Sequence, residues 1–304
     1  MRKVESKMKH ITDDDFAMRD TCVALGSFDG LHKGHRAVLD SLLATAKAKG
    51  LAPVLLSFDG DAAAEGPKRL TTEAEKRRLL ANSGLFALVS FKACGLTYAD
   101  ILREVAAKAL GAKAVVVGEN DSNLGVLQEL AGVCGYELIT CGTATQDGAE
   151  ITTARALDAL CASDYKTLEA LLGHPYFVYG RVEEGKHLGR TVGMPTANIG
   201  FAPNKQLPPD GVYGTITECD GKVYKGMANI GKRPTVDNYD YLTVENYILD
   251  FSQDIYGQYI CMNVHTQIRG VAKFNSLEEV KKQVELDIQA ARATLEESIK
   301  AYTA

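Results

Sequence analysis

The feature that most constrains the fold is a change in sequence texture near Tyr176. Before it, short apolar runs alternate with stretches whose apolar residues recur at helical spacing. The runs are residues 21–28, 52–58, 86–91, 112–118 and 136–141. This alternation is typical of a parallel sheet with crossover helices. It predicts a doubly wound α/β domain whose ligand site lies at the carboxyl ends of the strands.

Helices are expected between these strands, at residues 35–50, 71–84 and 98–112. The first two end in glycine, which commonly stops a helix. A further helical passage, residues 158–173, is expected to close the first half.

After Tyr176 the chain is rich in glycine and in β-branched and aromatic residues, and turn signals such as residues 208–211 separate the runs. Short strands at this spacing predict an antiparallel barrel or a sandwich. Residues 276–302 predict an amphipathic helix that begins with a Ser-x-x-Glu capping box. Because 304 residues exceed a typical domain of roughly 100–200, two domains are expected, at residues 1–170 and 171–304.

Composition points to small ligands. Proteins that bind nucleic acids or anionic membranes usually carry an excess of basic residues. The net charge of -5 therefore argues against both kinds of partner. The seven cysteines are scattered and include no CxxC pair, so neither a disulfide framework nor a zinc site is indicated. No apolar run approaches the roughly 20 residues that cross a bilayer. The start lacks the apolar segment of a secretory signal, so a cytoplasmic location is expected. Oligomeric state is left open.

The first chemical motif, residues 26–35, reads GSFDGLHKGH and connects the first strand to the first long helix. Glycines let a ligand approach the backbone, and a helix amino-terminus offers free N–H groups to phosphate. Two imidazoles three residues apart, His32 and His35, can hold a triphosphate in the same turn. The motif predicts a nucleotide site, against the plainer interpretation of a glycine-rich turn with two surface histidines.

The second motif, residues 185–199, reads GKHLGRTVGMPTANI and leads into a strand. Its glycines permit close contact with phosphates, and its lysine and arginine supply positive charge. A threonine hydroxyl and an asparagine carbonyl two residues apart can ligate Mg²⁺. These residues suit phosphoryl transfer, although chemistry alone leaves a plain glycine and proline loop equally open.

The first motif resembles the HxGH nucleotidyltransferases, specifically the FMN adenylyltransferase half of bacterial bifunctional riboflavin kinase/FAD synthetases. Residues 69–76 and 171–176 extend the resemblance. It implies that this half uses ATP and FMN. The implied nucleotide-binding residues are Gly26, Phe28, Asp29, His32, His35, Thr152, Thr153 and Arg155.

The second motif resembles the signature of riboflavin kinases, and residues 207–214, 226–235, 244–251 and 254–257 follow in that family's order. The resemblance implies a six-stranded antiparallel barrel with a C-terminal helix, with riboflavin and ATP as substrates. The implied nucleotide-binding residues are Gly185, Gly189, Arg190, Gly193, Thr196 and Asn198. Of these, Thr196 and Asn198 would also bind Mg²⁺. Glu245 would be the catalytic base, and Arg269 would contact the flavin.

Three segments of the first half differ from the family pattern. The loop after Gly118 is short and has no aromatic residue, residues 57–61 lack the usual proline and histidine, and Leu157 stands where an arginine is usual. Three hypotheses follow: an enzyme that makes FMN and then FAD, a monofunctional riboflavin kinase with a non-catalytic first domain, and a flavin-binding regulatory protein. The presence of Thr196, Asn198 and Glu245 favours a catalytic second domain.

Overall fold

The structure is a computed structural model that describes residues 8–12, 16–59, 68–93, 95–185, 194–233 and 241–303. The chain forms two compact units, Met1–Thr153 and Ala154–Ala304. The boundary expected between residues 170 and 171 stays a prediction. Each unit is described by itself below.

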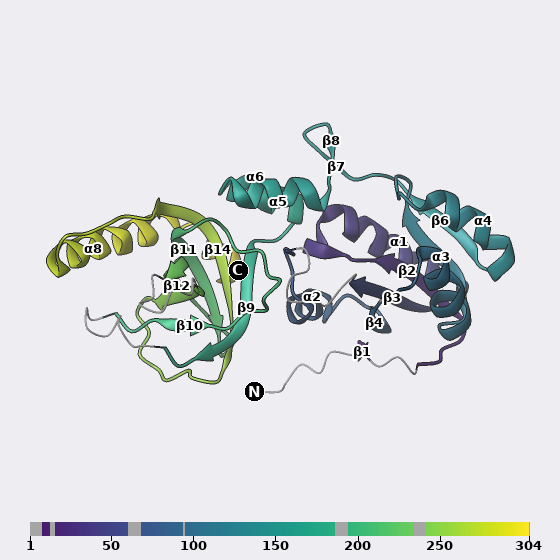
Figure 1. Ribbon diagram of the computed structural model, residues 1–304, viewed down its shortest axis with the longest axis horizontal. Helices are drawn as coiled ribbons and strands as arrows, with labels where there is room; N and C mark the ends of the chain where they lie inside the picture. Colours follow the sequence, from purple (N-terminus) through teal and green to yellow (C-terminus); the bar gives the residue numbers. More distant parts are fainter. Residues whose placement is uncertain are drawn as a thin grey trace. The chain divides into compact units, whose positions relative to one another are not determined.

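The first unit is built on a parallel six-stranded sheet of order β1-β4-β3-β2-β5-β6 (Figure 1). Its strands are β1 (Lys9–Ile11), β2 (Thr21–Gly26), β3 (Ala52–Asp59), β4 (Ala87–Lys92), β5 (Ala112–Gly118) and β6 (Glu137–Cys141). The strand order reverses between β2 and β5. In doubly wound sheets such a switch point opens a crevice at the carboxyl ends of the strands.

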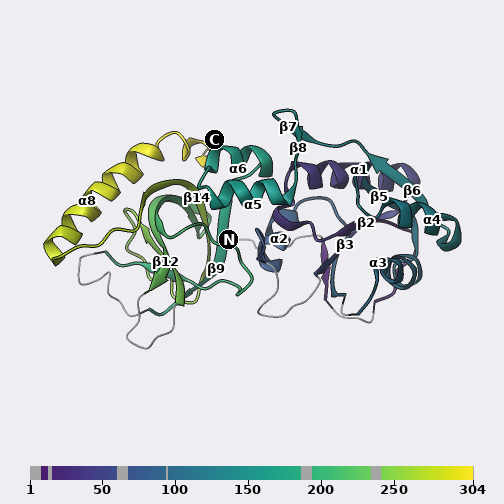
Figure 2. The ribbon, with the colours of Figure 1, turned by 45° about the horizontal axis from the view of Figure 1, so that its top comes forward.

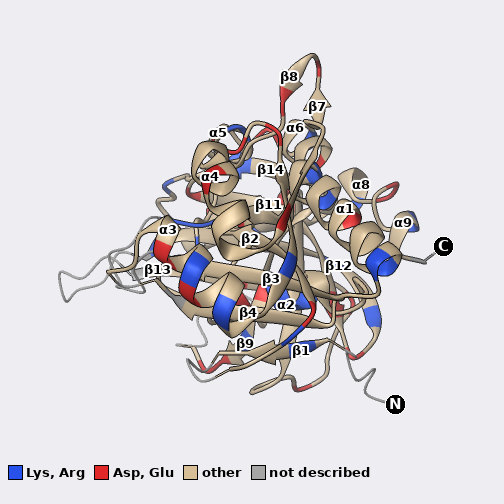
Figure 3. Ribbon diagram, turned by 90° about the vertical axis from the view of Figure 1, so that its right-hand side faces the viewer, with Lys and Arg blue, Asp and Glu red and all other residues tan. Residues whose placement is uncertain are grey.

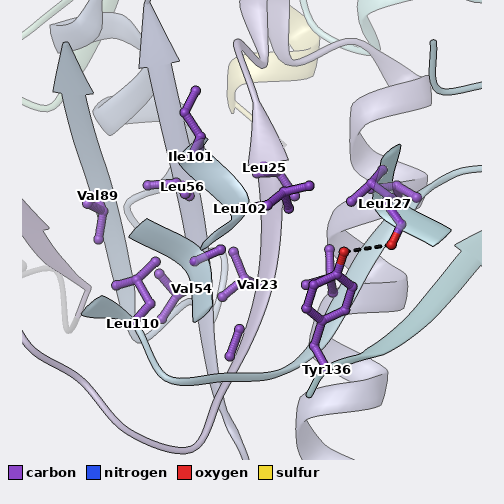
Figure 4. Packing of buried hydrophobic residues seen from close by; sticks show 14 of the residues in the cluster. Val23, Leu25, Val54, Leu56, Val89, Ile101, Leu102, Leu110, Leu127 and Tyr136 are labelled. Atoms are coloured by element: carbon purple, nitrogen blue, oxygen red, sulfur yellow. Dashed lines mark hydrogen bonds between the residues drawn. The ribbon is translucent and has the colours of Figure 1, made fainter. Parts of the chain in front are cut away.

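Helices cover both faces of this sheet because successive strand residues point to opposite sides. Buried residues of one parity, such as Ala24 and Leu55, pack against α1 (Lys33–Lys49) and α2 (Glu73–Leu80). Those of the other parity, such as Val23 and Leu56, pack against η2 (Ile101–Ala109) and α4 (Leu124–Cys134). Figure 4 shows this second core, in which the Tyr136 hydroxyl donates to the Leu127 carbonyl at 2.6 Å.

Short elements complete the connections of the first unit. They are η1 (Asp29–Leu31), α3 (Tyr98–Asp100), β7 (Thr145–Gln146) and β8 (Ala149–Glu150).

The single helical passage expected at residues 158–173 is instead two helices, α5 (Thr153–Cys161) and α6 (Tyr165–Leu172). They are separated at Ser163, whose φ of 56° is left-handed and interrupts a right-handed helix.

The second unit holds a closed antiparallel barrel of order β10-β13-β12-β11-β14-β9, as expected from the family resemblance. The strands are β9 (Tyr176–Glu183), β10 (Ala197–Ile199), β11 (Gly211–Cys219), β12 (Lys222–Arg233), β13 (Tyr241–Ile248) and β14 (Tyr259–Gly270). Closure removes the unpaired edges of an open sheet.

The C-terminal helix packs on the outside of this barrel (Figures 1 and 2). Helix α8 (Leu277–Thr294) begins at Ser276, whose side chain accepts from the Glu279 N–H as the capping box predicts. The predicted helix ran to residue 302, but α8 stops at Leu295, whose side chain is fully buried against the barrel. A short helix, α9 (Lys300–Thr303), follows.

Candidate active sites

The loop after β2 is a tight turn organised by Asp29. Phe28 and Leu31 have left-handed φ angles of 49° and 42°, so the strand ends at Gly26 rather than at residue 28 as expected. The Asp29 carboxylate accepts from the N–H groups of Leu70 and Thr71 at 3.0 and 2.8 Å and from the Thr71 hydroxyl at 3.0 Å. Asp29 therefore fastens the loop to the start of α2. Its expected contact with the nucleotide stays a prediction.

His32 and His35 lie together at the amino-terminus of α1. Nδ1 of His32 accepts the His35 backbone N–H at 3.2 Å, so His32 caps the helix, and a neutral ring carries its proton on Nε2. The two rings stack with centroids 3.6 Å apart and planes inclined by 16°. A side chain at Gly34 would come within 3.0 Å of the His32 ring and 3.1 Å of the Ile151 carbonyl. The glycine therefore allows the close packing of the His32 ring against this turn.

Both imidazoles are neutral near pH 7. Burial lowers the pKa of His32 to about 4, opposed in part by the nearby Asp29 carboxylate. Burial lowers the pKa of His35 well below its ordinary value, and His32 and Lys76 lower it further. Nδ1 of His35 is buried and has no hydrogen-bond partner within the described residues. The pair can therefore offer hydrogen bonds to phosphate oxygens without carrying charge.

These neutral imidazoles predict a pH-dependent stability. The pKa of His32 is about 4 in the folded chain and about 6.5 when unfolded, so the unfolded chain binds more protons between these values. This stabilisation is complete above about pH 6.5 and declines as the pH falls toward 4. We expect the thermal unfolding midpoint of His32→Asn to depend less on pH over this range. Equal slopes for variant and wild type would contradict this assignment.

Two cavities flank the histidine pair at the switch point. The smaller, of about 250 Å³, is lined by His32, His35, Asn120, Thr143, Thr152 and Thr153. The larger, of about 410 Å³, is lined by Gly26, Phe28, His35, Phe58, Tyr98 and Asp121. The structure thus gathers all but two of the residues expected to bind nucleotide in this half. Asp29 lies beneath the turn, and Arg155 lies on α5 in the second unit, where its role stays a prediction.

Two aromatic side chains in the larger cavity were missed by sequence reasoning. Phe58 comes from the end of β3 and Tyr98 from the start of α3, and their rings meet edge to face at 6.1 Å. The Tyr98 hydroxyl is buried and has no partner in the part of the chain that the structure describes. Burial, aided by Asp121, raises its pKa, so it stays protonated. The position of Phe58 near the carboxyl end of an expected strand could have identified it as a site residue, because ligands of such sheets bind at that edge.

In the second unit, the strand β10 carries Asn198 into a polar row. Asn198 lies directly opposite Glu245 on β13 and Glu183 on β9. Opposed residues of antiparallel strands point to the same side, with Cβ atoms about 4.5–5.5 Å apart. Buried neighbours such as Ala197 and Val244 point into the barrel, so this row lies on its outer face. Two residues predicted for one site are thereby brought together.

Gly185 leaves room for the Asn198 side chain. A side chain there would approach Nδ2 of Asn198 within 2.1 Å, so the asparagine amide rests on bare backbone. Three further residues of the expected kinase site, Gly189, Arg190 and Gly193, lie outside the described residues. Cavities of about 460 and 440 Å³ adjoin Thr196 and Asn198 respectively. The first of these is also lined by Phe251 and Tyr256.

Arg269 is held by the C-terminal helix. Its Nε lies 3.0 and 3.1 Å from the two carboxylate oxygens of buried Asp287, and a terminal nitrogen lies 2.9 Å from one of them. Gln283 donates to the same carboxylate at 2.9 Å. The residue two positions after Arg269 is Val271, which cannot pair with the arginine. The acidic partner of Arg269 therefore comes from α8.

Asn246, the neighbour of Glu245, points the other way. It is fully buried inside the barrel, where its amide bonds with the hydroxyls of Thr215 and Thr217 at 3.0 and 2.8 Å.

The charged residues of the sheet unit are mixed in sign over its strands and helices (Figure 3). Within the described residues, no helix is long and apolar enough to cross a membrane. No cluster of three or more His, Cys, Asp or Glu suited to a metal occurs among them either.

Comparison with known proteins agrees with this two-part arrangement. A family model described as FAD synthetase matches residues 15–155, and one described as riboflavin kinase matches residues 172–295. The bifunctional riboflavin kinase/FMN adenylyltransferase of Escherichia coli K12 is 32% identical over 295 residues, covering 91% of this chain and 93% of that protein. The chain belongs to the bifunctional riboflavin kinase/FMN adenylyltransferase family.

Other members of the family align equally completely. The Bacillus subtilis bifunctional enzyme is 29% identical and covers 94% of this chain and 97% of its own length. Among solved structures, a macrolide-efflux protein from Streptococcus pneumoniae matches with a TM-score of 0.77 and 26% identity, covering 94% of this chain and 99% of that one. The family match therefore extends over both units.

Proposed function

We propose that the chain phosphorylates riboflavin with ATP to give FMN and adenylylates FMN with a second ATP to give FAD. Membership of the bifunctional family and matches to both family models support this function. The observation that carries the kinase assignment is the pairing of Asn198 with Glu245 on one face of the barrel. The stacked His32 and His35 at the switch point support the adenylyl transfer.

In the kinase reaction, Glu245 accepts the proton of the ribityl 5′-hydroxyl. The hydroxyl oxygen then bonds to the γ-phosphorus of ATP while the bond from that phosphorus to the β-γ bridging oxygen breaks, and ADP leaves. Such transfers depend mostly on positioning and charge stabilisation. The Thr196 hydroxyl and Asn198 carboxamide are oxygen donors of the kind that Mg²⁺ accepts, and the ion would neutralise phosphate charge. Packing against Gly185 holds the Asn198 amide in place.

In the adenylyl transfer, a phosphate oxygen of FMN attacks the α-phosphorus of ATP. The bond from that phosphorus to the α-β bridging oxygen breaks, and pyrophosphate leaves. His32 and His35 donate hydrogen bonds to the phosphates, where negative charge accumulates on the leaving group. The larger cavity suits the flavin ring because Phe58 and Tyr98 supply aromatic walls that the short loop after Gly118 lacks.

A single reaction tests this function against its alternatives. The purified protein is incubated with riboflavin, ATP and Mg²⁺, and the flavins are separated by chromatography. We expect FMN first and FAD later, with Mg²⁺ chelation stopping FMN formation. FMN alone would indicate a monofunctional kinase. Flavin binding with no product would indicate a regulatory protein and overturn both enzymatic hypotheses.

A further inference from the structure

A second asparagine borders Glu245 on the side opposite Asn198. On the outer face of the barrel, Glu245 of β13 is paired with Asn229 of β12. Asn229 is paired in turn with Val212 of β11, and Val212 with Arg269 of β14. The pairing therefore runs from the proposed catalytic base to the expected flavin-binding arginine, with Val212 between them buried beneath α8.

The Asn229 side chain is open to solvent. Its strand neighbours Ala228 and Ile230 are buried inside the barrel, whereas Asn229 is exposed on the outside. Its side-chain amide makes no hydrogen bond to any residue that the structure describes. Two other asparagines of the barrel strands differ, since Asn246 and Asn263 are both buried and both hydrogen-bonded. Asn229 therefore contributes little to the barrel's own bonding and is available to a ligand.

The order of Glu245 and Asn229 matches the order of groups along the ribityl chain of riboflavin. Neighbouring strands lie about 4.8 Å apart, so Asn229 is one strand and Val212 is two strands from Glu245. With the 5′-hydroxyl at Glu245, the remaining ribityl hydroxyls extend toward Asn229. Val212 is buried beneath α8, so the ring does not reach it, and the assignment along the row extends as far as Asn229. A carboxamide both donates and accepts, so it can bind neighbouring hydroxyls that do the same.

We propose that Asn229 binds the secondary hydroxyls of the ribityl chain and so selects acceptors that carry this chain. The inference rests on the proposed kinase function and deepens it. It assigns recognition of the polyol to Asn229, separately from recognition of the ring. Asn229 would also hold the chain so that its terminal hydroxyl meets Glu245.

The test measures FMN formation by the full-length chain and the Asn229→Ala variant at varied riboflavin. We expect the KM for riboflavin to rise about tenfold, as for the loss of one hydrogen bond, and the KM for ATP to be unchanged. Lumiflavin, which lacks the ribityl chain, should inhibit FMN formation competitively with the same inhibition constant in both proteins. Lys222→Ala, an exposed change at the far end of β12, is the matched control and should leave all three constants unaltered.

A second variant separates the carboxamide from the size of the side chain. Asn229→Leu keeps a similar volume but neither donates nor accepts a hydrogen bond, so the KM for riboflavin should rise as it does in Asn229→Ala. An unchanged KM for ATP and an unchanged far-ultraviolet circular dichroism spectrum serve as the checks that the barrel of each variant is folded. A riboflavin KM within twofold of wild type, or a lumiflavin constant that rises with it, would overturn the inference while the kinase function stands. Absence of FMN formation in the wild type would instead remove the kinase function and this inference with it.

Discussion

Replacing Glu245 with glutamine is expected to reduce FMN formation about 10²–10⁴-fold, the usual contribution of a general base. Glutamine keeps the shape and the hydrogen-bonding reach of the side chain, but it cannot take the proton from the ribityl hydroxyl. The effect should appear in kcat more than in the KM for ATP, because the proton moves in the transition state. Initial rates of FMN formation, measured by chromatography at saturating riboflavin, provide the number.

The controls for this variant come from within the same chain. FAD formation from added FMN should be unchanged, since it uses the other site. Glu285→Gln, an exposed change on α8, tests the loss of a glutamate charge alone and should retain wild-type rates. If Glu245→Gln kept more than a tenth of the wild-type FMN rate, Glu245 would not be the base.

The second large effect is expected at His32. In His32→Asn, FAD formation from added FMN should fall about 10²–10³-fold, the cost of removing one donor that stabilises developing charge. Asparagine is itself a good helix-capping residue, so the cap on the His35 N–H can be retained while the imidazole is lost. This choice separates the chemical role of His32 from its structural one.

Two measurements complete the experiment. FMN formation from riboflavin should be unaffected, and far-ultraviolet circular dichroism should match the wild type. His174→Asn, in the second unit, gives the general cost of a histidine-to-asparagine change and should leave FAD formation intact. An His32→Asn variant that adenylylates FMN at the wild-type rate would show that its ring does not contact the phosphates.

Sequence periodicity predicted the main elements because long apolar runs carry a strong signal. All five strands expected in the first half are present, and the glycine-rich turn lies at the switch point as expected. Strand β1 was missed because three residues are too few for periodicity, and its pairing with β4 depends on tertiary contact. The apolar spacing of residues 101–109 also does not distinguish the π-helix η2 from an α-helix.

Parts of the two sites could not be predicted because they assemble from distant segments. Phe58 and Tyr98 are 40 positions apart and meet only when β3 and α3 are in place. The acidic partner of Arg269 is Asp287, which lies on a different element, the helix α8. The histidine pair was predictable because both residues lie on a single turn.

The ion pair between Arg269 and Asp287 joins the carboxyl-terminal helix to the arginine that is proposed to contact the flavin. Removal of α8 would leave Arg269 without its carboxylate partner Asp287. It would also expose the apolar patch of the barrel that the helix covers. Shortened or tagged versions made for laboratory use should therefore be altered at the amino-terminal end. A chain shortened at the carboxyl terminus is expected to lose FMN formation while it keeps FAD formation from added FMN.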